Sequence, residues 1–162
     1  MPLAPGELLS LTGMMAAGKS TVARALGARL ERQVVSTDAM LESRFGKPIP
    51  RIFAEDGEPA FRAAERAIIE RLDGRLVVDL GGGTFCDPVS AARLLAAGKV
   101  VFLDISPAAA AKRLASGRGR PLAANWEALH AERLPAYRRA TLTVAVDGLS
   151  AAEVAARILE AL

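Results

Sequence analysis

The chain has 162 residues, 51% hydrophobic and 24% charged, which indicates one globular domain and excludes a disordered chain. Its net charge of +3 comes without a lysine or arginine run, so no nucleic-acid partner is indicated, and scattered arginines suit the capture of phosphates or carboxylates. A single cysteine excludes a disulfide framework and a four-cysteine zinc site, and a single histidine argues against a histidine-based metal site.

Apolar runs alternate with helical patterns along the chain. In the first half, the patterns predict strand Glu7–Thr12, helix Ser20–Leu30, strand Gln33–Ser36 and helices Ala39–Phe45, Pro50–Asp56 and Glu58–Leu72. In the second half, they predict strand Arg75–Leu80, helix Pro88–Ala97, strand Lys99–Ile105, a helix from Pro107 to Ala115, helix Trp126–Arg139 and strand Leu142–Asp147. Ser150, with Glu153 three residues later, predicts a capping box for the last helix.

The order of these elements predicts the class of the fold. The five strands alternate with helices, and the runs at Val77 and Val100 are apolar on both faces, as in parallel strands covered on both sides. We therefore predict an α/β protein with a doubly wound parallel sheet. Segments 39–72 and 116–125 do not contribute to the sheet, so substrate contacts and a moving lid are expected there.

The strongest local signal follows the first predicted strand. Residues Gly13–Ser20 match the phosphate-loop pattern G-x-x-x-x-G-K-[ST] and open a predicted helix. The two glycines permit a tight turn whose N–H groups form an anion nest, and the helix N-terminus adds partial positive charge. Lys19 is expected to reach the β- and γ-phosphates, and Ser20 to bind Mg²⁺. The predicted nucleotide contacts are Gly13, Met14, Met15, Ala16, Ala17, Gly18, Lys19, Ser20 and Thr21.

Beyond this loop, the sequence resembles the shikimate kinases, small P-loop kinases of the nucleoside-monophosphate-kinase fold, over about residues 7–160. The motifs that carry the resemblance occur in the same order as in that family. After the phosphate loop they are Ser36-Thr37-Asp38, Phe53–Glu58 with Phe61-Arg62 and Glu65, Leu80–Thr84, Arg120-Pro121-Leu122, and Glu132-Arg133 with Pro135 and Tyr137-Arg138.

The resemblance implies a three-layer α/β/α fold with a five-stranded parallel sheet in the order 2-3-1-4-5. It implies a single domain over residues 1–162, with a substrate-binding helical insertion at about 37–72 and a lid at about 116–126. The implied reaction transfers the γ-phosphoryl group of Mg-ATP to the 3-hydroxyl of shikimate, in the pathway to chorismate and the aromatic amino acids. The family also implies a monomer.

The resemblance implies a role for each residue of the acceptor site. Shikimate carries hydroxyls and one carboxylate, which call for aspartate and arginine as partners. Asp38, Lys19 and Arg120 are the implied catalytic residues, and Arg120 is the lid arginine over the ATP phosphates. On a helix, Glu65 could brace the guanidinium of Arg62. The implied acceptor contacts are Asp38, Arg62, Gly81, Gly82, Gly83 and Arg133.

Ordinary structural roles are the alternatives at these positions. Arg62 and Arg133 could be solvated helix arginines, and Asp38 could be a helix cap. The three consecutive glycines could form a plain turn, and Arg120 could be an ordinary loop charge. Cys86 and His130 have no catalytic partner nearby in the sequence, so no role is expected for them.

The sequence departs from the family at several points. Ser36 replaces an aspartate that helps to hold Mg²⁺, and we hypothesise that Asp79 supplies the missing carboxylate, so that Ser20 and Asp79 are the predicted metal residues. Ala16 replaces a glycine that is common in the phosphate loop. The segment between Arg120 and Arg133 is shorter than usual, which raises the question of how completely the lid closes.

Two alternative functions come from these departures. One is a related P-loop kinase for another small anionic acceptor, such as a gluconate or nucleoside-phosphate kinase. The other is a non-catalytic ATP-binding protein. No apolar run approaches the roughly 18 residues of a membrane span, and the first residues carry no basic export segment. We therefore expect a cytoplasmic protein with no membrane partner.

Overall fold

The structure is a computed structural model that describes residues 2–118 and 125–162, without the side chains of residues 115–118. The strands are β1 (Leu8–Gly13), β2 (Gln33–Ser36), β3 (Leu76–Asp79), β4 (Gly98–Asp104) and β5 (Leu142–Ala145). The helices are α1 (Lys19–Leu30), α2 (Thr37–Phe45), α3 (Ile49–Glu55), α4 (Glu58–Arg71), α5 (Pro88–Ala97), α6 (Pro107–Arg118), α7 (Trp126–Tyr137) and α8 (Ala151–Ala161), with a 3₁₀ turn at Thr84–Cys86.

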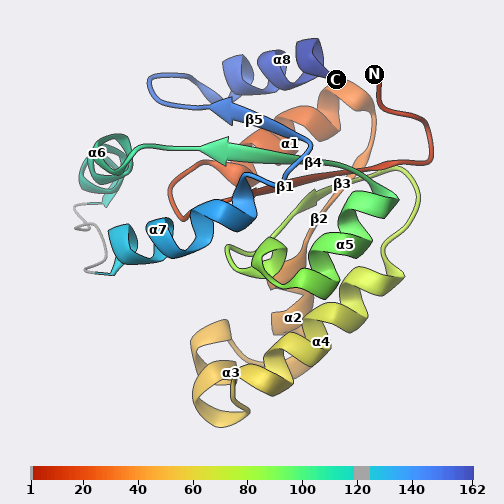
Figure 1. Ribbon diagram of the computed structural model, residues 1–162, viewed down its shortest axis with the longest axis vertical. Helices are drawn as coiled ribbons and strands as arrows, with labels where there is room; N and C mark the ends of the chain where they lie inside the picture. Colours follow the sequence, from red (N-terminus) through yellow and green to blue (C-terminus); the bar gives the residue numbers. More distant parts are fainter. Residues whose placement is uncertain (1, 119–124) are drawn as a thin grey trace.

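All five strands belong to one parallel sheet in the order β2-β3-β1-β4-β5, which confirms the predicted class and strand order (Figure 1). The central strand β1 pairs with β3 on one side and with β4 on the other. The chain leaves β1 toward β2 and leaves β3 toward β4, so the connections diverge between β1 and β3. Such a divergence at the carboxyl ends of parallel strands is where ligands bind in open α/β sheets.

Helices cover both faces of the sheet. Helices α1 and α8 pack together on one face, while α4 and α5 lie against the other (Figure 1). Alternate residues of β1 supply the two sides, because successive side chains of a strand point to opposite faces. Leu9 and Leu11 join the core with α1 and α8, and Leu8 joins the core with α4 and α5. A third, smaller core joins α2, α3 and α4 through Leu41, Ile52, Phe61, Ala64 and Ile68.

Short polar side chains cap several helices. Ser36 caps α2, because its hydroxyl accepts a hydrogen bond of 3.2 Å from the Ala39 N–H. Asp38 lies in the first turn of α2 and is not the cap, so the capping role considered for it is wrong. The predicted capping box of Ser150 and Glu153 is confirmed in both directions at 3.1 Å.

The loop predicted over residues 116–125 begins later than expected. Helix α6 continues to Arg118, although the pattern predicted a loop from residue 116, because the alanine-rich run favours helix strongly enough to include Gly117. The remainder, with Arg120, lies at residues 119–124, outside the described residues. In the described part of the chain, no helix is long and apolar enough to cross a membrane.

Several other element ends differ from the predictions by one or two residues, among them the end of α7 and the start of β4. Helix α7 continues past its internal Pro135 and ends at Tyr137, two residues before the predicted end at Arg139. Strand β4 begins at Gly98, where the backbone of Leu8 on β1 approaches so closely that a Cβ atom would clash. Gly98 therefore both ends helix α5 as its C-cap and permits the pairing of β1 with β4.

Candidate active site

The loops after β1 and β3 meet at the divergence of the sheet and line a cavity of about 760 Å³. The loop after β1 is the phosphate loop, and the loop after β3 carries Gly81, Gly82 and Gly83. Residues from α2, α3 and α4 form one wall, and Arg133 reaches in from α7. The predicted site residues that line this cavity are Met15, Ala16, Gly18, Lys19, Ser20, Thr21, Asp38, Arg62, Asp79, Gly81, Gly82, Gly83 and Arg133. Gly13, Met14 and Ala17 belong to the same phosphate loop but do not line the cavity, and Arg120 lies outside the described residues.

The phosphate loop depends on unusual backbone conformations. Gly13 has φ 148°, and a Cβ atom there would lie 2.7 Å from the carbonyl oxygen of Leu103. Gly18 has φ 88° at the start of α1. Ala16 is also left-handed, with φ 75°, which costs an L-residue about 1–2 kcal/mol relative to the ordinary regions. The replacement of the family's glycine by Ala16 thus places strain at the tip of the loop.

Lys19 lies inside the curve of this loop. Its ammonium group donates to the carbonyl oxygens of Gly13 at 2.8 Å and Met14 at 3.1 Å. Desolvation lowers the pKa of Lys19 from 10.5 to about 8, against the opposing effect of the carboxylates of Asp79 and Asp38. The amine is therefore held among carbonyls and carboxylates, in a position where phosphate oxygens would favour its charged form.

This lowered pKa predicts that nucleotide binding takes up protons in alkaline solution. At about pH 9 the Lys19 amine is mostly neutral in the free protein, and bound phosphates favour the ammonium form. Titration calorimetry in two buffers of different ionisation enthalpy should show proton uptake on ADP binding near pH 9 and almost none near pH 6.5. ADP affinity should fall as the pH rises through about 8. Binding without proton uptake near pH 9 would contradict this prediction.

Ser20 and Asp79 are direct neighbours although 59 positions separate them. The Ser20 hydroxyl donates to the Asp79 carboxylate at 2.5 Å, and Asp79 pairs in register with Ser36 on β2. Ser36 uses its own hydroxyl as the cap of α2. No group of three or more His, Cys, Asp and Glu side chains able to hold a metal occurs among the described residues. One carboxylate and one hydroxyl nevertheless fit Mg²⁺, which commonly takes its other ligands from phosphates and water.

Each glycine of the loop after β3 lies against a different predicted acceptor residue. A Cβ atom at Gly81 would clash with the carboxylate of Asp38. At Gly82 it would lie 2.8 Å from Nη1 of Arg133, and at Gly83 it would lie 2.7 Å from Nη2 of Arg62. The absence of side chains at these glycines leaves space for three polar side chains beside the loop, and contact of the glycines with an acceptor stays a prediction.

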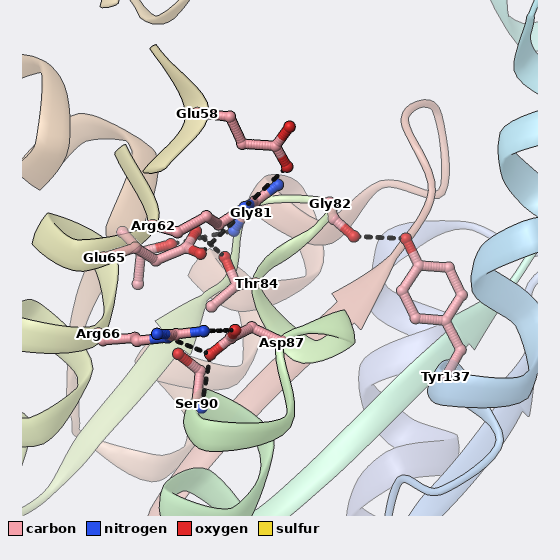
Figure 2. A network of polar contacts seen from close by, with 11 residues as sticks. Glu58, Arg62, Glu65, Arg66, Gly81, Gly82, Thr84, Asp87, Ser90 and Tyr137 are labelled. Carbon is pink, nitrogen blue, oxygen red and sulfur yellow. Dashed lines mark hydrogen bonds and ion pairs between the residues drawn. The ribbon is translucent and has the colours of Figure 1, made fainter. Parts of the chain in front are cut away.

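A buried carboxylate braces Arg62 (Figure 2). Glu65 is only 1% exposed, and its carboxylate accepts from Nη1 of Arg62 at 2.8 Å and from the hydroxyl of Thr84 at 2.7 Å. Glu58 adds a weaker ion pair at 3.7 Å. The predicted brace is confirmed, and Arg62 is not a solvated arginine. Burial raises the pKa of the nearby Asp38, and the negative charge of Glu65 raises it further, against the opposing effect of Lys19.

Several residues position the site although the sequence analysis assigned them no role in it. Thr37 is buried, and its hydroxyl accepts from the Gly81 N–H at 3.0 Å. The Tyr137 hydroxyl donates to the carbonyl of Gly82 at 2.5 Å (Figure 2), and burial raises the pKa of Tyr137 to about 12. Arg113 and Trp126 donate to the carbonyl oxygens of Ala16 at 3.0 Å and Met15 at 3.1 Å. These contacts depend on long-range packing, which local patterns do not predict.

Two further cavities adjoin the first. One of about 660 Å³ shares Arg62, Gly83 and Arg133 with it and is also lined by Cys86. Burial raises the pKa of the Cys86 thiol, which disfavours the reactive thiolate. The other, of about 270 Å³, lies beside Gly18 and is lined by Arg113 and Val154 among others. It opens beside the phosphate loop, on the side of helix α8.

A parallel sheet in this order, with a phosphate loop at its divergence and a side-chain cluster beside it, defines a P-loop kinase fold. The family model for shikimate kinase matches residues 15–162. The chain belongs to the shikimate kinase family, whose members use ATP as phosphate donor. It is accordingly an ATP-dependent phosphotransferase.

Individual relatives agree with this assignment. The chain is 44% identical to a shikimate kinase of Thermobifida fusca, over 96% of this chain and 94% of that protein. It is 39% identical to a shikimate kinase of Thermus thermophilus, over 98% and 91% of the two chains. A solved shikimate kinase from Acinetobacter baumannii in complex with shikimate is 31% identical, with a TM-score of 0.86 over 96% of this chain and 92% of that one.

The alternative of a gluconate kinase is not favoured. A gluconokinase from Sinorhizobium meliloti covers 97% of this chain and 95% of its own, but it is 22% identical with a TM-score of 0.59. That likeness shows a common fold alone.

Proposed function

We propose that this protein transfers the γ-phosphoryl group of Mg-ATP to the 3-hydroxyl of shikimate, with the two substrates bound at opposite ends of the 760 Å³ cavity. The single observation that carries the proposal is the approach of Asp38, Arg133 and Arg62 to the successive glycines 81–83. It supports an acceptor that carries both hydroxyl and carboxylate groups. The complex of the A. baumannii relative with shikimate supports the same acceptor.

At the acceptor end, Arg62 and Arg133 bind the carboxylate, because their planar guanidinium groups can each donate two hydrogen bonds. The bracing by Glu65 holds Arg62 in one orientation before the acceptor arrives. Asp38 binds the ring hydroxyls and accepts the proton of the reacting one. Its raised pKa makes it a stronger base than an exposed aspartate.

At the nucleotide end, the N–H groups of the phosphate loop and the ammonium of Lys19 hold the β- and γ-phosphates. The 270 Å³ cavity beside Gly18 receives the base of the nucleotide, against the guanidinium of Arg113. Ser20 and Asp79 are the residues that would hold Mg²⁺. Bound there, Mg²⁺ would supply positive charge against the negative charge that develops on the phosphates during transfer.

Arg120 is proposed to add positive charge to the transferring phosphoryl group from the lid, as the family pattern implies. We propose further that the chain acts as one catalytic domain, with the insertion at about 37–72 as its acceptor-binding part. The monomeric state and the cytoplasmic location expected from the sequence stay predictions.

A coupled assay of ADP release tests the proposed function. With Mg-ATP alone, release should be slow, and addition of shikimate should raise it at least tenfold over the background hydrolysis. Gluconate is the matched control, because it also offers a carboxylate and several hydroxyls but on an open chain. Release that gluconate supports as well as shikimate would overturn the acceptor assignment. ATP binding with no acceptor-dependent release would favour the non-catalytic alternative.

A further inference from the structure

The single tryptophan of the chain lies behind the phosphate loop. Trp126 opens helix α7 and is 1% exposed, and its indole N–H donates to the carbonyl oxygen of Met15 at 3.1 Å. The ring of His130, one helical turn later, stacks on the indole with centroids 5.0 Å apart. Trp126 does not belong to the residues that line the 760 Å³ cavity, whereas Met15 and Ala16 do. The indole therefore contacts the loop from the side away from the cavity.

The contact controls the direction of one peptide group. The carbonyl of Met15 and the N–H of Ala16 belong to the same trans peptide, so they point in opposite directions. Because the carbonyl is held toward Trp126, the Ala16 N–H is directed to the cavity side of the loop. A peptide that turned over would present a carbonyl oxygen to the phosphates and repel them.

This peptide is also the one at which the loop is strained. Ala16 has φ 75°, a conformation that glycine adopts freely and alanine does not. The next carbonyl, that of Ala16, accepts from Arg113 at 3.0 Å. Side chains from α6 and α7 thus hold two consecutive carbonyls on either side of the strained residue.

We infer that Trp126 is a positioning residue for the nucleotide: its indole N–H fixes the Met15–Ala16 peptide so that the Ala16 N–H faces the phosphates. The inference rests on the nucleotide end of the proposed function and is independent of the acceptor. The left-handed conformation at Ala16 is unfavourable for alanine, so the loop would tend to leave it. The hydrogen bond from Trp126 holds the Met15–Ala16 peptide in place and so compensates for the alanine at this position.

The test replaces the indole donor and keeps an aromatic ring. Trp126→Phe should bind ADP about fivefold to tenfold more weakly than the wild type, as expected for the loss of one net hydrogen bond. The KM for ATP should rise by the same factor, while the KM for shikimate should not change. A merely structural role would change both KM values or neither. Amide exchange should become faster at Ala16 specifically.

His130→Leu is the matched control, because it removes the ring stacked on the indole and leaves the N–H donor in place. This variant should bind ADP like the wild type. Equal ADP affinity of Trp126→Phe and wild type would overturn the inference, and so would an equal loss in both variants. Failure of the wild type itself to bind ADP would count against the proposed function instead.

A measurement on the unchanged protein covers the case in which Trp126→Phe fails to fold. The chain has one indole, so a ¹⁵N–¹H spectrum contains one indole resonance. Saturating ADP should shift this resonance, and saturating shikimate alone should leave it in place. An indole resonance that does not respond to ADP would overturn the inference.

Discussion

Asp38→Asn is expected to lower kcat by about 10²–10⁴-fold and to leave the affinity for ADP nearly unchanged. Asp38 lies in the first turn of α2 against Gly81, at the acceptor end of the cavity. Asparagine fits the same space and still accepts a hydrogen bond from a ring hydroxyl. It cannot take up the proton that leaves when the phosphoryl group is transferred, so the loss should appear in kcat.

The raised pKa of Asp38 adds a prediction about pH. Burial and the charge of Glu65 raise that pKa, so protonation should switch off the base at a higher pH than an exposed aspartate would. The rate should therefore fall on the acidic side as the pH drops through this raised value, and Asp38→Asn should lack this fall.

The matched control for Asp38→Asn is Glu42→Gln, one turn later on α2 and in the same cavity. Its carboxylate accepts a hydrogen bond of 3.0 Å from the Ile49 N–H, and the amide oxygen of glutamine can accept the same bond. ADP-release rates and ADP affinity by calorimetry should stay close to wild type in this control. A decrease of less than tenfold in kcat for Asp38→Asn would show that the proton leaves by another route.

Asp79→Asn is expected to raise the Mg²⁺ concentration needed for tight ADP binding by about 10–100-fold. The Asp79 carboxylate accepts a hydrogen bond from the Ser20 hydroxyl at the end of the phosphate loop. The amide oxygen of asparagine can still accept that hydrogen bond, but it lacks the negative charge that attracts a hard dication. The serine at position 36 is neutral and engaged as a helix cap, so it cannot replace this charge.

The measurement is a titration of Mg²⁺ against ADP affinity without any acceptor. It should be made near pH 6.5, because Asp79 also supports the charge of Lys19, whose pKa of about 8 would fall further in the variant. Asp104→Asn is the control, since Asp104 ends strand β4 at the same edge of the sheet but does not line the 760 Å³ cavity. An unchanged Mg²⁺ requirement in Asp79→Asn would show that Asp79 has no role toward the metal.

The separation in sequence between interacting residues explains why some site residues were predictable and others were not. The phosphate loop was predictable, because its glycines, Lys19 and Ser20 are contiguous and their chemistry depends on one strand-to-helix turn. The brace between Arg62 and Glu65 was also predictable, since three residues span one turn of a helix. The acceptor residues were assigned by resemblance, and their geometry became visible only in the fold.

The sequence by itself determined the alternation of strands and helices, the phosphate loop and the capping box of the last helix, because periodicity and capping are properties of neighbouring residues. Only the tertiary structure decided that Ser20 meets Asp79 and that Trp126 holds Met15. It also decided that each of the glycines 81–83 faces a different side chain. These contacts depend on strand register and on the packing of α2, α4 and α7 around one edge of the sheet, which no local pattern encodes.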